Sequence, residues 1–100
     1  NELSIASLKM DLTQHKVWRE DILIDLSKKE FNLLRFMLLY QNEIITRRQI
    51  ASEVWNINFD TDTNFIDVAV RRLRSKIDDG HDLKLIHTIR GLGYKLSVQA

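Results

Sequence analysis

The stretch "NFIDVAVRRLRSKIDDG", residues 64–80, combines an apolar stripe with a dense run of positive charge. Its apolar side chains recur at i, i+4, i+7 and i+11, the spacing of a buried helix face, and they are Ile66, Val70, Leu73 and Ile77. Asp62 or Thr63 is the expected N-cap, and Gly80 is the expected C′ residue that stops the helix. The stretch therefore predicts an amphipathic helix with a basic outer face.

The outer face of this helix allows two interpretations. It presents Asn64, Phe65, Val68, Arg71, Arg72 and Ser75, with Asp67 and Arg74 at its edges. The planar donor fork of arginine suits bidentate contact with phosphate or with guanine. The alternative is an ordinary solvated surface, because Asp67–Arg71 and Arg74–Asp78 both have the i,i+4 spacing of helical ion pairs. Asp78 and Asp79 also stand at the end where the helix dipole disfavours acidic residues, at a small cost.

Two helix starts of the same design precede this segment. Ser27 and Glu30 have the spacing of a capping box, and the flanking Leu26 and Phe31 have that of a hydrophobic staple. A second box and staple follow, formed by Thr46, Gln49, Ile45 and Ile50. The first helix carries apolar residues over most of its surface, namely Phe31, Leu33, Leu34, Met37, Leu38 and Tyr40. The second is short, ends near Val54, and turns Ile50, Ala51 and Val54 inward.

Both ends of the chain predict β-structure. Residues 3–26 contain the short apolar runs "LSIASL", "KMDLT", "HKVWRE" and "DILIDL", with corners at 13–14 and 20–21. Trp18 is expected to be a packed or half-packed strand aromatic. Residues 84–98 predict a hairpin that turns at Gly91-Leu92-Gly93, with Tyr94, Leu96 and Val98 alternating on its second strand. The predicted fold is α+β, a winged helix-turn-helix with an N-terminal antiparallel sheet at 3–26, three helices at about 28–79 and a β-hairpin wing at about 84–98.

The hairpin tip is a second candidate surface. Arg90 and Lys95 flank the turn, and an arginine at such a tip can enter a narrow minor groove. An exposed turn residue without a ligand is the equally open alternative. Tyr94 is expected to pack in its strand, and a phosphate contact through its hydroxyl is the lesser alternative.

Composition excludes several classes of function. One hundred residues, 44% of them hydrophobic and 29% charged, predict one globular domain. The net charge of +1 indicates no partner by itself, but residues 47–100 carry +2 and residues 1–46 carry −1. The absence of cysteine rules out disulfides, zinc thiolates and thiol catalysis. His15, His81 and His87 lack metal-ligand spacing, and no catalytic motif or carboxylate pair occurs. We therefore expect a protein that is not an enzyme, with no metal and no cofactor.

Location is indicated more weakly. The longest apolar run, "FMLLY" at 36–40, is too short to span a membrane, and no signal peptide opens the sequence. A reducing cytoplasm is the simpler expectation. The chain starts at Asn1 rather than Met, so we expect it to be an excised part of a longer protein.

Three motifs together resemble a known family. They are "LSKKEFNLLRFMLLYQNEIITRRQIASEVW", then "IDVAVRRLRSKID", then "LIHTIRGLGYKL" at fixed spacing. The chain resembles the C-terminal effector domain of OmpR/PhoB-type two-component response regulators from about Leu3 to Ser97. The sequence of residues 58–78 looks most similar to that of the copper- and oxidant-responsive branch of the family.

The resemblance implies sequence-specific binding of double-stranded DNA. It matches the major-groove readers to Asn64, Val68, Arg71, Arg72 and Arg74. Arg90 matches the minor-groove arginine of the wing, and Thr88 and Tyr94 match residues that contact the DNA backbone. The loop from Trp55 to Thr63 matches a segment that supports phosphate contact or touches RNA polymerase. The chain departs from some relatives at Ala69, where they carry a polar DNA-contacting side chain.

The resemblance also implies partners. These are a second copy bound head-to-tail on direct repeats, a receiver domain outside this chain, and a cognate sensor kinase acting through that receiver in the bacterial cytoplasm. The competing hypothesis is a winged helix used as a protein-interaction module, in which the arginines bind an acidic partner. The modest net charge keeps that hypothesis open.

Overall fold

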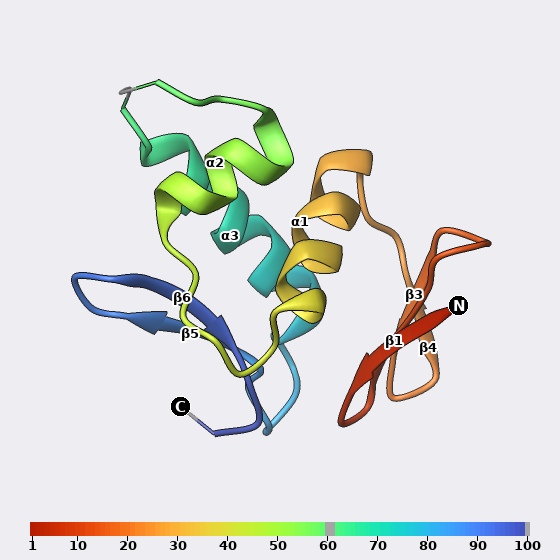
Figure 1. Cartoon of the computed structure of the whole chain (residues 1–100). Coiled ribbons are helices and arrows are strands. Elements are labelled where there is room, and N and C mark those ends of the chain that lie inside the picture. Colours follow the sequence, from red (N-terminus) through yellow and green to blue (C-terminus); the bar gives the residue numbers. More distant parts are fainter. Residues whose placement is uncertain (60–61, 100) are drawn as a thin grey trace.

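The computed structural model describes residues 1–59 and 62–99. Four strands come first, β1 (Glu2–Ile5), β2 (Leu8–Asp11), β3 (Lys16–Arg19) and β4 (Ile22–Ile24). Three helices follow, α1 (Lys28–Leu39), α2 (Arg47–Trp55) and α3 (Asn64–Ile77), and the strands β5 (Ile86–Ile89) and β6 (Gly93–Leu96) close the chain. The N-terminal sheet and the C-terminal hairpin lie on opposite sides of the helices (Figure 1). The predicted α+β winged helix is confirmed.

The N-terminal sheet is an antiparallel meander in the order β1-β2-β3-β4. The predicted corners are confirmed, and at 20–21 both Glu20 and Asp21 have positive φ, as the two-residue turns that match strand twist require. The run "LSIASL" was wrongly read as one strand, because the chain turns at Ala6-Ser7 and β2 already begins at Leu8. Ala6 adopts a φ of +50°, a left-handed conformation for which alanine gives no sequence signal.

The helix starts follow the predicted capping chemistry. Both capping boxes are formed, with the side chains of Ser27 and Thr46 accepting from the backbone N–H groups of Glu30 and Gln49. Thr63 is the N-cap of α3 by position, but the carboxylate of Asp62 accepts the N–H of Asn64 at 3.0 Å. α3 ends at Ile77 with Asp78 as its C-cap, so the C′ residue is Asp79, and Gly80, predicted at C′, lies one residue further along, in the turn that follows.

The core is one cluster in which the predicted stripes meet. The inward residues of α3 are all buried, as are those predicted for α2. Two predictions were wrong: Tyr40 is 46% exposed at the end of α1, and Val98 is exposed beyond β6. Tyr40 is exposed because α1 stops at Leu39, which turns the next side chain out of the stripe.

A buried ion pair joins the N-terminal sheet to the end of α3. The Arg19 Nη1 atom lies 3.0 Å from Asp78 Oδ1, and both side chains are 1% exposed. The carboxylate of Asp78 also accepts the backbone N–H groups of Leu85 and Ile86, where the chain enters β5. The expected pair between Arg74 and Asp78 is therefore replaced, and Asp78 organises the fold rather than merely opposing the helix dipole.

Candidate nucleic-acid interface

The outer face of α3 presents most of the predicted reading residues to solvent. Asn64, Val68, Arg71 and Arg72 are exposed along this face. Phe65 was wrongly placed among them, since it is half-buried and packs edge-on against Trp55, with ring centroids 5.3 Å apart. The exposed outer face of α3 is therefore narrower than the sequence analysis predicted. It carries one exposed valine among polar and cationic side chains.

Arg74 connects this helix to the hairpin. Its Nη2 donates to Thr88 Oγ1 of β5 at 2.9 Å. Its Nε is buried and has no hydrogen-bond partner among the described residues. The guanidinium is consequently held between α3 and β5, with its Nη2 atom at the exposed Thr88.

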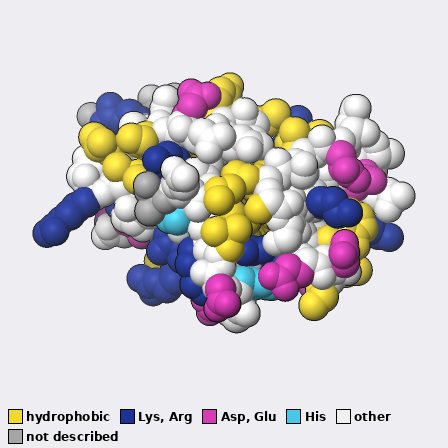
Figure 2. Space-filling view, turned by 90° about the horizontal axis from the view of Figure 1, so that it is seen from below, with side chains coloured by type: hydrophobic (Ala, Val, Ile, Leu, Met, Phe, Trp, Pro, Cys, Tyr) yellow, Lys and Arg dark blue, Asp and Glu magenta, His cyan; other side chains and the backbone are white. Residues whose placement is uncertain are grey.

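The hairpin wing is seated tightly on the segment before α2. Tyr94 and Ile45 exchange two backbone hydrogen bonds, of 2.8 and 2.9 Å. At Gly93, an added Cβ atom would lie 2.0 Å from the Ile45 carbonyl oxygen, so only glycine allows this approach. Arg90 stands exposed at the tip beyond this contact. Figure 2, which views Figure 1 from below, shows Lys and Arg side chains projecting on the left, the side of the hairpin, and most acidic side chains of this view toward its bottom and right.

A second Arg–Asp pair lies where α2, α3 and the wing meet. Arg47 Nε donates to Asp67 Oδ1 at 2.7 Å, and the Tyr94 hydroxyl donates to the same oxygen. The Arg47 guanidinium also stacks over the Tyr94 ring, 5.2 Å from its centroid. The predicted pairing of Asp67 with Arg71 is thus replaced by Arg47, and Arg71 acts on Asp67 only by longer-range attraction.

The electrostatics of this cluster keep Asp67 ionised and Tyr94 protonated. Burial would raise the pKa of Asp67, but the hydrogen bonds from Tyr94 and Arg47 outweigh it and hold that pKa below its usual value. Burial, followed by the bond to Asp67, raises the pKa of Tyr94. The hydrogen bond to Asp67 likewise raises the pKa of Arg47. Tyr94 is therefore buried with its hydroxyl engaged, which agrees with the packed interpretation of this residue.

Trp55 lines a cavity beside the reading face. This cavity of about 370 Å³ lies between the three helices, lined by Lys29, Leu33, Phe65, Val68 and Arg72 among others. Lys29 Nζ lies 5.9 Å from the centre of the Trp55 ring and donates to the Val54 carbonyl at 3.1 Å. Of the predicted loop 55–63, residues 60–61 lie outside the described residues.

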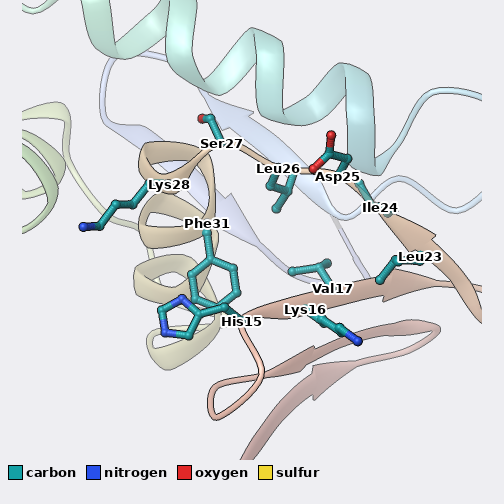
Figure 3. A pocket seen from close by; sticks show the side chains of 10 residues that line it. All are labelled: His15, Lys16, Val17, Leu23, Ile24, Asp25, Leu26, Ser27, Lys28 and Phe31. Carbon is teal, nitrogen blue, oxygen red and sulfur yellow. The ribbon is translucent and has the colours of Figure 1, made fainter.

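A second hollow lies on the other side of α1, beside the N-terminal sheet. A groove of about 700 Å³ lies between β3, β4 and the start of α1, where the His15 ring stacks on Phe31 with centroids 4.7 Å apart (Figure 3).

In residues 1–59 and 62–99, no three His, Cys, Asp or Glu side chains are placed to hold a metal ion. No helix in those ranges has the length and apolar character to cross a bilayer.

Residues 19–96 match the family described as "Transcriptional regulatory protein, C terminal". This chain is an OmpR/PhoB-type effector domain. The effector domain is 52% identical over 98 residues to the "Transcriptional regulatory protein CusR" of Escherichia coli K12, covering 98% of this chain and 43% of that protein. It is 51% identical over 98 residues to the "Transcriptional activator protein IrlR" of Burkholderia pseudomallei, again covering 98% and 43%.

Solved structures agree with this family assignment. The effector domain superposes on the RstA DNA-binding domain of Klebsiella pneumoniae, solved in complex with the RstA box, with a TM-score of 0.88 and 25% identity over 98% of both chains. A streptococcal redox sensor described as evolved from response regulators gives a TM-score of 0.84 and 34% identity, covering 94% of this chain and 41% of that one. The effector domain spans less than half the length of the curated relatives that it matches.

In the effector domain, the predicted residues fall into two groups. The exposed residues are Asn64, Val68, Arg71, Arg72, Thr88 and Arg90, whereas Tyr94 is buried and Trp55 and Arg74 are half-buried. Sequence reasoning missed Arg47, which the fold brings against both Asp67 and Tyr94. No sequence signal indicated it, because Arg47 reaches the wing through the tertiary pairing of Ile45 with Tyr94.

Proposed function

We propose that this effector domain binds double-stranded DNA at specific sequences, as the output domain of a transcription regulator. The observation that carries the proposal is the joining of two exposed basic elements. The face of α3 with Arg71 and Arg72 is bonded to the hairpin with Arg90, through Arg74–Thr88 and Asp67–Tyr94. One surface thus offers a helix for the major groove and a loop for the adjacent minor groove.

Each exposed side chain suits a particular contact. Arg72 is placed for bidentate hydrogen bonds to guanine, and the exposed apolar Val68 suits the methyl group of thymine. Arg71 and Arg74 suit phosphates, which position the domain without reading sequence. Arg90 suits a narrow A·T-rich minor groove. Thr88 completes the set as a backbone contact, while Tyr94 serves mainly to place the wing.

The comparisons support DNA as the partner. CusR and IrlR are named as transcriptional regulators, and the RstA domain was solved bound to its DNA box. An acidic protein partner has no comparable support, because none of the relatives and solved structures named above is described as bound to one.

The wider proposal concerns the whole protein. We infer that a receiver domain, phosphorylated by a sensor kinase, controls this effector domain in the bacterial cytoplasm. Two copies bind direct repeats head-to-tail, and the segment 55–63 contacts RNA polymerase. These inferences rest on the family, since this chain covers 43% of the relatives named above. The family also supports a protein that acts by binding rather than by catalysis.

Selection from random-sequence DNA tests the proposal. Duplexes retained by the domain are sequenced, and a sharp motif, repeated in one orientation, is expected. Arg72→Ala should then cost about 1–3 kcal/mol on the selected site and relax preference at one base pair. Arg35→Ala, an exposed arginine of α1, is the matched control and should leave affinity unchanged. Absence of any enriched motif at low salt would favour the protein-interaction hypothesis instead.

A further inference from the structure

The wing is bonded to α3 at two points rather than one. Tyr94 of β6 donates through its hydroxyl to Asp67, and Thr88 of β5 accepts from Arg74 at 2.9 Å. Thr88 and Tyr94 are direct partners across the hairpin. Their partners on α3 are seven residues apart, which is about two turns or 10 Å of helix. The hairpin is consequently attached along a length of the helix.

Two attachment points restrict the orientation of the hairpin relative to α3 more than one would. The two Ile45–Tyr94 backbone bonds and the contact at Gly93 fix where the base of the hairpin sits. A further bond, from the Asn42 N–H to the Leu96 carbonyl at 2.8 Å, holds β6 at a second point. None of these bonds involves β5 or the exposed tip, so they do not fix the direction of the tip. Bonds to two points of α3 that are about two turns apart oppose rotation of the tip about its base, so they set the direction in which the tip with Arg90 points.

Asp67 is unfavourable for DNA binding, which argues that its carboxylate serves to position the wing. A carboxylate on a surface that meets phosphates repels them, and it weakens the attraction supplied by Arg71 one turn away. Arg47 partly neutralises it at 2.7 Å. The same carboxylate is, however, an ionised acceptor for the Tyr94 hydroxyl, and charge-assisted hydrogen bonds of this kind are stronger than neutral ones.

We propose that Asp67–Tyr94 and Arg74–Thr88 form a two-point clamp that fixes the wing's direction relative to α3, so that helix and wing engage DNA together. Asp67 and Tyr94 are positioning residues in this scheme, and the inference rests on the proposed function. With the clamp intact, the tip that carries Arg90 already has the direction needed to reach the minor groove before DNA binds. The contact between Arg90 and the groove is therefore made at little entropic cost. Without the clamp, much of that contact is lost although Arg90 remains.

A double-mutant cycle tests the clamp. Affinity for the selected operator is measured for the wild-type domain, Arg90→Ala, Tyr94→Phe and the double variant. We expect Arg90→Ala to weaken binding about tenfold in the wild type and less than about threefold beside Tyr94→Phe, because coupled sites are not additive. Tyr40→Phe, which removes a hydroxyl from an exposed tyrosine just after α1, should leave the tenfold effect unchanged.

Equal penalties for Arg90→Ala in both backgrounds would overturn the clamp while leaving DNA binding intact. Asp67→Asn repeats the cycle should Tyr94→Phe fold poorly, since asparagine keeps the shape and loses the charge. A measurement without DNA separates the two proposals further. In the free domain, Tyr94→Phe should speed amide hydrogen exchange in β5 and β6 about fivefold and leave β1–β3 unchanged. Unchanged exchange in the hairpin would also refute the clamp, whereas a wild-type domain that selects no sequence would refute the proposed function.

Discussion

Two Arg–Asp pairs stand at opposite ends of α3 and differ mainly in their contact with water. Arg19 and Asp78 are 3.0 Å apart and each 1% exposed, whereas Arg47 and Asp67 are 2.7 Å apart and 32% and 34% exposed. The inner pair joins the sheet to the helix end, and the outer pair joins α2 and the wing to the basic face. The paired groups are the same, so the comparison shows what burial and the hydrogen bonds that accompany it add.

Burial makes the inner pair a condition of folding. The Arg19 guanidinium donates to Ser7, to the carbonyls of Ile77 and Leu83, and to Asp78. Removing one charge would strand the other in a low-dielectric interior. The outer pair remains in contact with water, which screens it, so its main effect is expected on DNA binding rather than on stability.

The largest expected effect comes from Arg19→Met. It keeps an unbranched, apolar stem but removes the guanidinium and leaves the Asp78 carboxylate buried without its cation, which should lower the free energy of unfolding by about 3–5 kcal/mol. Chemical denaturation measures the loss. Arg35→Met, at an exposed position of α1, should change stability by less than about 0.5 kcal/mol. Similar losses for both variants would contradict the assigned importance of burial.

Gly93→Ala tests whether backbone contact, rather than charge, holds the outer junction. The new methyl group would lie 2.0 Å from the Ile45 carbonyl oxygen at a φ of +156°. Strain and the weakened Ile45–Tyr94 bonds should cost about 2–4 kcal/mol. Gly91→Ala adds a methyl group that meets nothing within 4 Å at a φ of +77°, and it should cost about 1–2 kcal/mol. A smaller loss at Gly93 than at Gly91 would count against the tight seat.

Arg47→Met is the direct counterpart of Arg19→Met at the outer pair. Because the pair is about one-third exposed, we expect a loss of no more than about 1 kcal/mol in the free energy of unfolding. Thermal and chemical unfolding should therefore remain close to wild type while affinity for the operator falls. A stability loss matching that of Arg19→Met would remove the distinction between the pairs.

The smallest effect is expected from a third pair, between Lys76 and Glu30, whose side chains are 42% and 11% exposed and 2.7 Å apart. Burial would raise the pKa of Glu30, but Lys76 and the backbone of Ser27 hold it below its usual value. A carboxylate whose pKa is lower in the folded state than in the unfolded state stabilises the fold at pH values above its unfolded-state pKa. That stabilisation is lost as the pH falls toward the folded-state pKa. Stability should thus decline as pH drops below about 4.3, and less steeply in Glu30→Gln.

Glu43→Gln is the control for that pH series, since Glu43 is exposed beyond α1. It should reproduce the wild-type dependence. Glutamine also suits the capping box at position 30, so the variant separates the charge of Glu30 from its role as a cap. Parallel acid transitions for wild type and Glu30→Gln would show that Lys76 contributes nothing.

Local signals in the sequence were enough for the helices and for much of the reading face. The capping boxes involve residues three apart, and the stripe Ile66, Val70, Leu73 and Ile77 repeats within one segment. Such patterns are decided by neighbours along the chain. The exposed positions of Arg71 and Arg72 follow directly, because they lie opposite that stripe.

Pairings across the fold could not be read in this way. Asp78 had an i,i+4 partner in Arg74, yet it pairs with Arg19, 59 positions earlier. Asp67 likewise pairs with Arg47 instead of Arg71. In both cases tertiary packing placed a cation nearer than the helical neighbour, and sequence spacing carries no information about that competition. The turn at Ala6 was missed for the related reason that tertiary context imposes its φ.

The division of α3 into faces has a consequence for redesign. Ile66, Val70, Leu73 and Ile77 belong to the core, Asp67 and Arg74 hold the wing, and Phe65 supports Trp55. Ala69 packs against the core, Lys76 pairs with Glu30, and Arg71 is assigned to phosphate. The positions that remain interchangeable are Asn64, Val68, Arg72 and Ser75. A library restricted to those four positions should yield domains with new operator preferences and an unaltered scaffold, whereas a whole helix transplanted from a relative would bring its own attachment to the wing along with its specificity.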